Sequence, residues 1–180
     1  MKIEYTEIEN LIIINPEIFN DDRGYFFEAY NKPKFIEQGI NFQFIQDNQS
    51  FSKRGVVRGL HLQIKPFAQA KLVRVLEGEI LDVAVDLRKD STTYGHYVSV
   101  ILSAENKKQL MIPHGFAHGF SVLSETASVS YKVDQVYNKE SEIGIRYDDP
   151  ILDIDWKLNK DEIIVSKKDL VLPSFKEMGY

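Results

Sequence analysis

The chain has 180 residues, no cysteine and a formal net charge of −5, and 43% of its residues are hydrophobic. This composition excludes a disordered chain, disulfide bonds and thiolate chemistry, and the acidic balance argues against nucleic acid as a partner. The longest apolar run, residues 11–14, is far shorter than the ~20 residues of a membrane span, and no signal-peptide pattern precedes it. We therefore expect one cytoplasmic domain over residues 1–180 that makes no membrane contact.

The first 45 residues are expected to form two strands, a turn and a helix. Leu11–Ile14 is expected to be a strand ended by the Asn-Pro pair that follows it. A turn at Asp21–Gly24 leads into a second strand over Tyr25–Tyr30. Asn31 as a cap, an early proline and a glycine stop frame the one clear helix. Residues 42–45 are expected to be extended.

Alternating apolar residues then predict a hairpin and a series of short strands. Lys71–Leu76 and Glu79–Leu87 flank the turn signal Glu77-Gly78. Further strands are expected over Tyr97–Leu102, Gln109–Ile112, Phe116–Leu123 and Ala127–Val133. Short strands at this spacing, with one clear helix, predict an all-β antiparallel sandwich or barrel. After residue 150, Trp156 is expected to anchor the tail, and a short helix is expected near Lys167–Leu170.

Three proton-handling side chains lie at strand positions whose same-face neighbours are small or apolar. These are His61, Lys71 and Tyr131. A polar side chain facing a core costs free energy unless it is paired or used, so a barrel that collects the three would hold an apolar small-molecule pocket. Arg58 has the opposite parity to His61, and it would join them only if Gly59 marked a bulge that re-aims it.

The side-chain types indicate removal of a proton next to a carbonyl group. A neutral His61 is the usual base near neutral pH, Lys71 could stabilise an enolate, and Tyr131 could return a proton from the opposite face. Each also has an ordinary structural interpretation, as a hydrogen-bonded strand histidine, a solvated lysine and a rim tyrosine. Asp169 likewise ends a helix-capping pattern, Ser166–Asp169.

The histidines also decide the expectation about a metal. His96 and His114 are expected at the surface, whereas His118 lies in an apolar run and is ambiguous. Barrels of this kind often bind a metal through two histidines separated by one residue, but the residue two after His61 is a glutamine. Since three protein ligands are the usual minimum for a transition metal, we expect no metal site.

Four motifs follow one another along the chain. They are GVVRGLHLQ (55–63), the run from AQAKLV to HGFAHGF (68–120), SYK (130–132) and GIRYDDPILDIDW (144–156). Together they resemble the dTDP-4-dehydrorhamnose 3,5-epimerase family over about residues 15–156. The resemblance implies a cupin-type jelly roll, or double-stranded β-helix, with a few short helices. It also implies no cofactor, and a homodimer in which an N-terminal strand crosses to the partner.

The reaction implied by this resemblance inverts C3 and C5 of dTDP-4-dehydro-6-deoxy-D-glucose and gives dTDP-4-dehydro-L-rhamnose, in dTDP-L-rhamnose biosynthesis. It implies His61 as the base with Asp169 behind it, Tyr131 as the acid on the other face, and Lys71 beside the C4 oxygen. The implied substrate contacts are Arg23, Glu28, Gln46, Asn48, Arg58, His118, Tyr137, Glu142 and Lys168. Tyr137 would stack on the thymine, and the first two contacts could serve the neighbouring chain's site.

Two departures from the family pattern are expected to affect packing only. Ala70 stands where glycine is usual before the lysine, and Met111 stands where tryptophan is frequent. Other functions stay open at this point. They are a mono-epimerase or 3,4-ketoisomerase on a related nucleotide sugar, a non-catalytic carbohydrate-binding cupin, and a metal-dependent oxygenase cupin.

Overall fold

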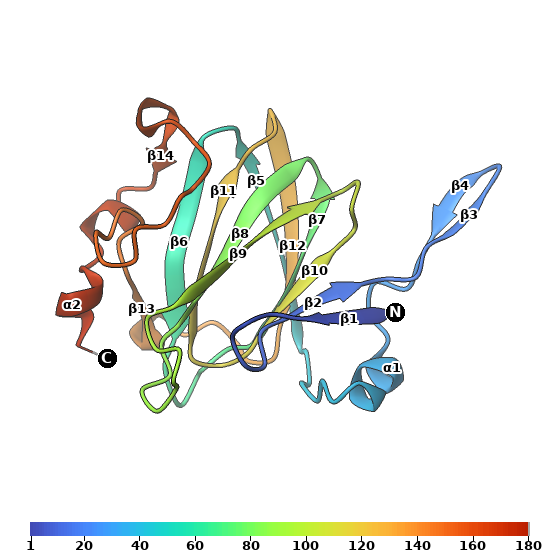
Figure 1. Ribbon diagram of the computed structural model, residues 1–180, viewed down its shortest axis with the longest axis horizontal. Coiled ribbons are helices and arrows are strands. Elements are labelled where there is room, and N and C mark those ends of the chain that lie inside the picture. The colour runs from blue at the N-terminus through green and yellow to red at the C-terminus, as the bar shows by residue number, and fades with distance from the viewer. Residues whose placement is uncertain (180) are drawn as a thin grey trace.

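Two sheets face each other in the computed structural model (Figure 1). The structure describes residues 1–179, so Tyr180, the last residue of the expected domain, lies outside the described residues. The first sheet consists, in spatial order, of β1 (Lys2–Tyr5), β2 (Ile12–Asn15), β10 (Gln109–Ile112), β7 (Lys71–Glu77), β12 (Thr126–Val133) and β5 (Gln46–Lys53). The second consists of β13 (Glu142–Gly144), β6 (Val56–Gln63), β11 (Phe116–Val122), β8 (Glu79–Asp86) and β9 (Tyr97–Ser103). Neighbours are antiparallel, except that β14 (Ile164–Val165) pairs with β6 in parallel.

The remaining elements are short. A two-stranded ribbon, β3 (Phe19–Asp21) with β4 (Gly24–Phe26), projects away from both sheets (Figure 1). Helix α1 spans Lys32–Glu37, and its predicted cap is confirmed, since Asn31 Oδ1 accepts a hydrogen bond from the Lys34 backbone N–H at 3.3 Å. The others are α2 (Phe175–Met178) and the 3-10 turns η1 (Lys139–Ser141), η2 (Lys160–Glu162) and η3 (Asp169–Val171).

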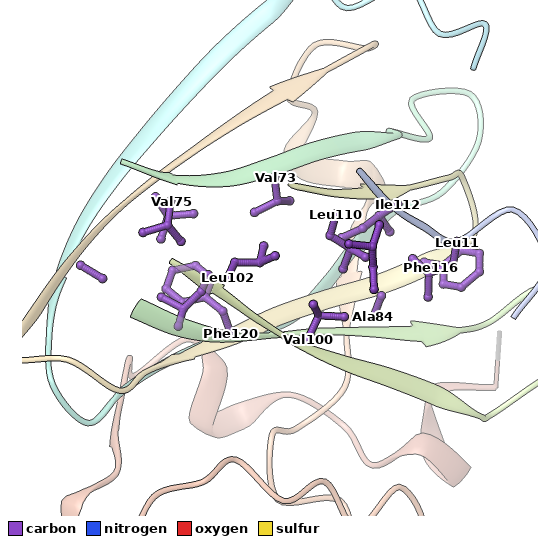
Figure 2. Packing of buried hydrophobic residues seen from close by; sticks show 14 of the residues in the cluster. Leu11, Val73, Val75, Ala84, Val100, Leu102, Leu110, Ile112, Phe116 and Phe120 are labelled. Carbon is purple, nitrogen blue, oxygen red and sulfur yellow. The ribbon is translucent and has the colours of Figure 1, made fainter. Parts of the chain in front are cut away.

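The hydrophobic core lies between the two sheets. Figure 2 shows Val73 and Val75 of β7 on one side of this core and Ala84 and Phe120 of the second sheet on the other. Alternation along each strand produces this arrangement, because every second side chain points to the same face. Removing these apolar side chains from water contributes roughly 25 cal/mol per Å² buried. The predicted all-β, cupin-type jelly roll is confirmed.

The C-terminal segment covers the outer face of the second sheet (Figure 1). Trp156 is 5% exposed, and its indole N–H donates to the Tyr147 carbonyl oxygen at 2.7 Å. The predicted anchoring role of Trp156 is therefore confirmed. This placement matters for the site, because it brings the tail that follows Trp156 back across β6.

Some predicted elements differ from the observed ones. The strand expected over Tyr25–Tyr30 ends at Phe26, which is opposite Phe19, the first residue of its partner β3. The short helix expected near Lys167–Leu170 is the 3-10 turn η3. Among the described residues, no helix has the length and apolar character needed to cross a membrane.

Candidate active site

A cavity of about 450 Å³ is lined by strands of both sheets and by the C-terminal segment. Seven predicted site residues line it: Arg58, His61, Lys71, His118, Tyr131, Lys168 and Asp169. Apolar groups such as Val57, Phe120 and Ile164 form much of the remaining wall. The shared interior that strand parity predicted for the histidine, the lysine and the tyrosine is confirmed.

Gly59 lies in a bulge that puts Arg58 and His61 into the same cavity. Arg58 is opposite Phe120 and His61 is opposite His118, so β6 takes one residue more than β11 between these two pairs. The extra residue reverses the alternation, and residues three apart on β6 then face the same way. Arg58 is further held by a hydrogen bond from its Nε to Ser52 Oγ at 3.0 Å. The bulge that would turn Arg58 toward the interior is therefore present at Gly59.

Asp169 stands directly behind His61. His61 Nε2 donates to Asp169 Oδ1 at 2.7 Å, although the two residues are 108 positions apart in the sequence. The carboxylate is almost fully buried at the start of η3, and the Asp169 backbone N–H donates to Ser166 Oγ. Burial alone would raise the pKa of Asp169, but the hydrogen bond and the electrostatic interaction with His61 keep that pKa below its ordinary value. The histidine is thereby fixed with Nδ1 as its basic nitrogen.

Lys71 extends from β7 toward His61. Its Nζ donates to the His61 carbonyl oxygen at 3.5 Å. Removal from water lowers the pKa of Lys71 to about 8, and the negative charges of Asp82 and Glu142 oppose this shift. At neutral pH the amine therefore still carries most of its charge, in a place where water screens that charge poorly.

A second histidine–carboxylate pair lies beside the first. His118 Nε2 donates to Asp82 Oδ1 at 2.7 Å, and both side chains are buried. Burial lowers the pKa of His118 against the opposing effect of Asp82. The ambiguity about His118 is resolved in favour of a buried residue on the cavity wall.

Asp82 is the member of this group that sequence reasoning missed. In the alternating sequence of β8, Asp82 lies on the same face as the apolar Ile80 and Ala84, so the sequence already placed its carboxylate on the core face. Its Oδ2 atom is buried with no hydrogen-bond partner among the described residues. A buried carboxylate needs compensation, and the charge of Lys71 supplies part of it. An acidic residue at an inward strand position was therefore the signal that could have found it.

Tyr131 lies on β12, in the sheet opposite His61, and burial raises its pKa above the ordinary value. Farther out, Tyr137 donates its hydroxyl to Glu142 Oε2 at 2.8 Å, and Lys168 forms an ion pair with the same carboxylate. Burial would raise the pKa of Glu142, but these two partners keep it lowered. Tyr137 is 54% exposed, which leaves it open to a stacking ligand.

Six predicted contacts do not line this cavity, namely Tyr137 and Glu142, described above, and four residues nearer the N-terminus. Arg23 lies at the tip of the β3–β4 ribbon and pairs with Asp21. Glu28 pairs with Lys34 near α1. Gln46 and Asn48 bond to each other through their side chains at 2.8 Å on β5, and Asn48 is directly opposite Tyr131 of β12. The two β5 residues thus adjoin the site, whereas the ribbon lies away from it (Figure 1).

The two remaining histidines lie outside the cavity. His96 and His114 are exposed, as predicted, and His114 Nε2 donates to Asp134 Oδ2 at 2.8 Å. Within residues 1–179, no three His, Asp or Glu side chains are grouped in a way that could hold a metal ion.

The fold and the site together define a jelly-roll protein whose cavity holds the groups needed to remove and return a proton beside a carbonyl group. A family model described as dTDP-4-dehydrorhamnose 3,5-epimerase matches residues 5–177. The chain belongs to the dTDP-4-dehydrorhamnose 3,5-epimerase family, as its motifs predicted.

Relatives with this name span almost the whole chain. The protein from Methanothermobacter thermautotrophicus is 52% identical over 165 residues, which are 91% of this chain and 89% of the relative. The crystal structure of the enzyme from Elizabethkingia anophelis matches with a TM-score of 0.96 and 54% identity, and covers 100% of this chain and 99% of that chain. A structure from Legionella pneumophila, in complex with dTDP-4-keto-L-rhamnose, matches with a TM-score of 0.93 and 48% identity over 97% and 93% of the two chains.

Proposed function

We propose that the chain inverts both C3 and C5 of dTDP-4-dehydro-6-deoxy-D-glucose and so forms dTDP-4-dehydro-L-rhamnose. The observation that carries this proposal is the His61–Asp169 pair, which shares one cavity with Lys71 and Tyr131. Family membership and the ligand of the Legionella relative support the substrate class.

His61 takes the proton in the first step. With its Nε2–H donated to Asp169, the ring presents Nδ1 as the base, and the carboxylate stabilises the imidazolium that forms. The electron pair of the broken C–H bond moves toward C4, and the C4 ketone oxygen becomes an enolate. The Lys71 ammonium lies within 3.5 Å of the His61 backbone and stabilises that developing charge.

Tyr131 returns a proton in the second step. His61 belongs to the second sheet and Tyr131 to the first, so the base and the acid stand on opposite walls of the cavity. The carbon gains the phenol proton from the opposite face, the ketone re-forms and the configuration is inverted. The raised pKa of Tyr131 keeps the phenol protonated until this step. C3 and C5 both flank C4, so one base, one acid and one enolate stabiliser serve both centres without any change of oxidation state.

The experiment that tests the proposal is solvent exchange. We expect the protein, incubated in D2O with dTDP-4-dehydro-6-deoxy-D-glucose, to place deuterium at both C3 and C5, as read by NMR of the sugar. Label at one carbon only would identify a mono-epimerase, and a moved keto group would identify a ketoisomerase. Binding without label at either carbon would reject the epimerase proposal in favour of a binding protein.

The charge of Lys71 predicts an alkaline limit to the reaction. The amine is charged below its pKa of about 8 and neutral above it, so kcat/KM should fall as the pH rises through this value. Tyr131 does not produce the limb, because its pKa is raised and it stays protonated there. The check is the pH profile of kcat/KM for the wild type and for Lys71→Arg. Arginine stays charged over this range, so the alkaline fall in kcat/KM should be absent in Lys71→Arg. If the fall were unchanged in the variant, a group other than Lys71 would be responsible for it.

We further propose that the active form is a homodimer whose ribbon β3–β4 completes the cavity of the partner. Phe19, Tyr25 and Phe26 of the ribbon are 55%, 59% and 65% exposed. A group of exposed aromatic side chains of this kind is typical of a surface that contacts another protein. Arg23 at its tip is a cation suited to a diphosphate, and the cavity of its own chain does not include it.

Mixing two defective variants tests this exchange. Arg23→Ala should weaken activity because it damages the ribbon, and His61→Ala should abolish activity because it removes the proposed base from the cavity. If the ribbon serves the partner, co-refolded mixtures contain heterodimers with one intact site, and roughly a quarter of the wild-type rate should return. A mixture no more active than its components would show that Arg23 acts within its own chain or not at all.

A further inference from the structure

Strands β6 and β11 touch backbone to backbone at a pair of glycines. Gly59 has φ +118°, and a Cβ added there would lie 2.5 Å from Gly119 Cα and 2.7 Å from the His118 carbonyl oxygen. A Cβ on Gly119 would lie 2.7 Å from the Arg58 carbonyl oxygen. Distances this short would force the backbone to move, so both positions require glycine. Gly59 precedes His61 by two residues and Gly119 directly follows His118, so the contact adjoins both histidines of the cavity.

The Gly59 N–H lies in the bulge of β6 and contacts the C-terminal segment. The next residue, Leu60, exchanges backbone hydrogen bonds with Ile145 at 3.1 and 3.0 Å, in the direction of β13. The Gly59 N–H donates to Asp169 Oδ2 at 3.4 Å. Each oxygen of this buried carboxylate thus receives a donor from β6, Oδ1 from the His61 ring and Oδ2 from the Gly59 backbone.

We propose that Gly59 is a positioning residue, whose backbone N–H orients the Asp169 carboxylate and, through it, the ring of His61. The role within the reaction rests on the proposed function. Asp169 reaches the site on a 3-10 turn of the C-terminal segment, and a carboxylate held at one oxygen can still rotate about its own axis. The second donor fixes its plane against the same strand that carries the base. A catalytic group held in this way keeps the narrow geometry that proton transfer needs.

The hydrogen bond from the Gly59 N–H to Asp169 can be tested without replacing Gly59, by replacing Asp169 instead. We expect amide exchange at Gly59 to become at least about tenfold faster in Asp169→Ala than in the wild type, because the N–H loses its acceptor. Leu60 is the internal control, since its N–H bonds to Ile145 and its protection should not change. Equal protection of Gly59 in the two proteins would overturn the proposal. This readout does not depend on any activity, so it stands even if the epimerase proposal fails.

The effect on the reaction is tested by a double-mutant cycle. Gly59→Ala should lower kcat by about tenfold or more through misplacement of Asp169, and it should lower kcat no further in the Asp169→Ala background. Gly78→Ala is the matched control, because Gly78 also has a positive φ of +77° and a Cβ there meets the Thr126 carbonyl oxygen at 2.0 Å, away from the cavity. Losses that multiply in the double variant would overturn the proposal, and if Gly59→Ala does not fold, the exchange measurement decides.

Discussion

Replacing His61 with alanine should abolish deuterium incorporation at both C3 and C5. One base serves both carbons in the proposed mechanism, so its loss stops both exchanges together, and kcat should fall by roughly 10²–10⁴ or more. The measurement is NMR of the sugar after incubation in D2O with equal amounts of wild-type and variant protein. The fold should persist, because the His61 side chain is on a cavity wall and not in the core between the sheets.

His114→Ala is the matched control for this substitution. His114 also pairs with an aspartate, Asp134, through a hydrogen bond of 2.8 Å, but this pair lies outside the cavity. Its loss should leave exchange at both carbons unchanged. If His61→Ala retained exchange at one carbon, two bases would be at work, and His118 with its partner Asp82 would be the second candidate.

Tyr131→Phe should separate removal of the proton from its return. The variant keeps the base and Lys71, so C–H bond breaking continues and deuterium still enters, whereas inversion at C5 falls much more steeply. The physical reason is that the proton is then returned from the face of the base, which restores the starting configuration. A ratio of exchange to inversion, measured by NMR for each carbon, is the appropriate readout.

Tyr97→Phe provides the comparison, because Tyr97 is a partly buried tyrosine that packs against the outer core of the second sheet. It should leave both exchange and inversion as in the wild type. Equal loss of exchange and inversion in Tyr131→Phe would mean that the tyrosine takes part in removing the proton or in binding, and its assignment as the acid would be wrong.

Strands whose residues alternate clearly between apolar and polar were predictable, whereas β1, β3 and β5 were not predicted, and the site was predictable only in part. Lys71–Leu76 and Glu79–Leu87 match β7 and β8 closely, since a glycine turn and two apolar faces define a hairpin locally. The strand expected to run to Tyr30 failed because strand length is set by a partner, which sequence periodicity does not contain. The short strands β13 and β14 were missed for the same reason.

The contacts within the site show a similar division. Parity placed His61, Lys71 and Tyr131 in one interior, because that inference needs only the direction of neighbouring side chains. No local pattern connects His61 to Asp169 across 108 positions, and only the family resemblance suggested that pair. Asp82 was visible at an inward position but was given no role, since its partner His118 lies on another strand.

The proposed base and acid lie on opposite sheets, so the hydrophobic core between the sheets also determines the distance between them. Facing sheets lie about 10 Å apart, at a distance set by the side chains packed between them. Val73 and Phe120, from opposite sheets, are such side chains, and Phe120 also lines the cavity. The same packing that stabilises the jelly roll therefore sets the width of the slot into which a sugar ring must fit. Core packing thus fixes the distance between the two sheets, and this distance limits the thickness of the sugar ring that the cavity can accept.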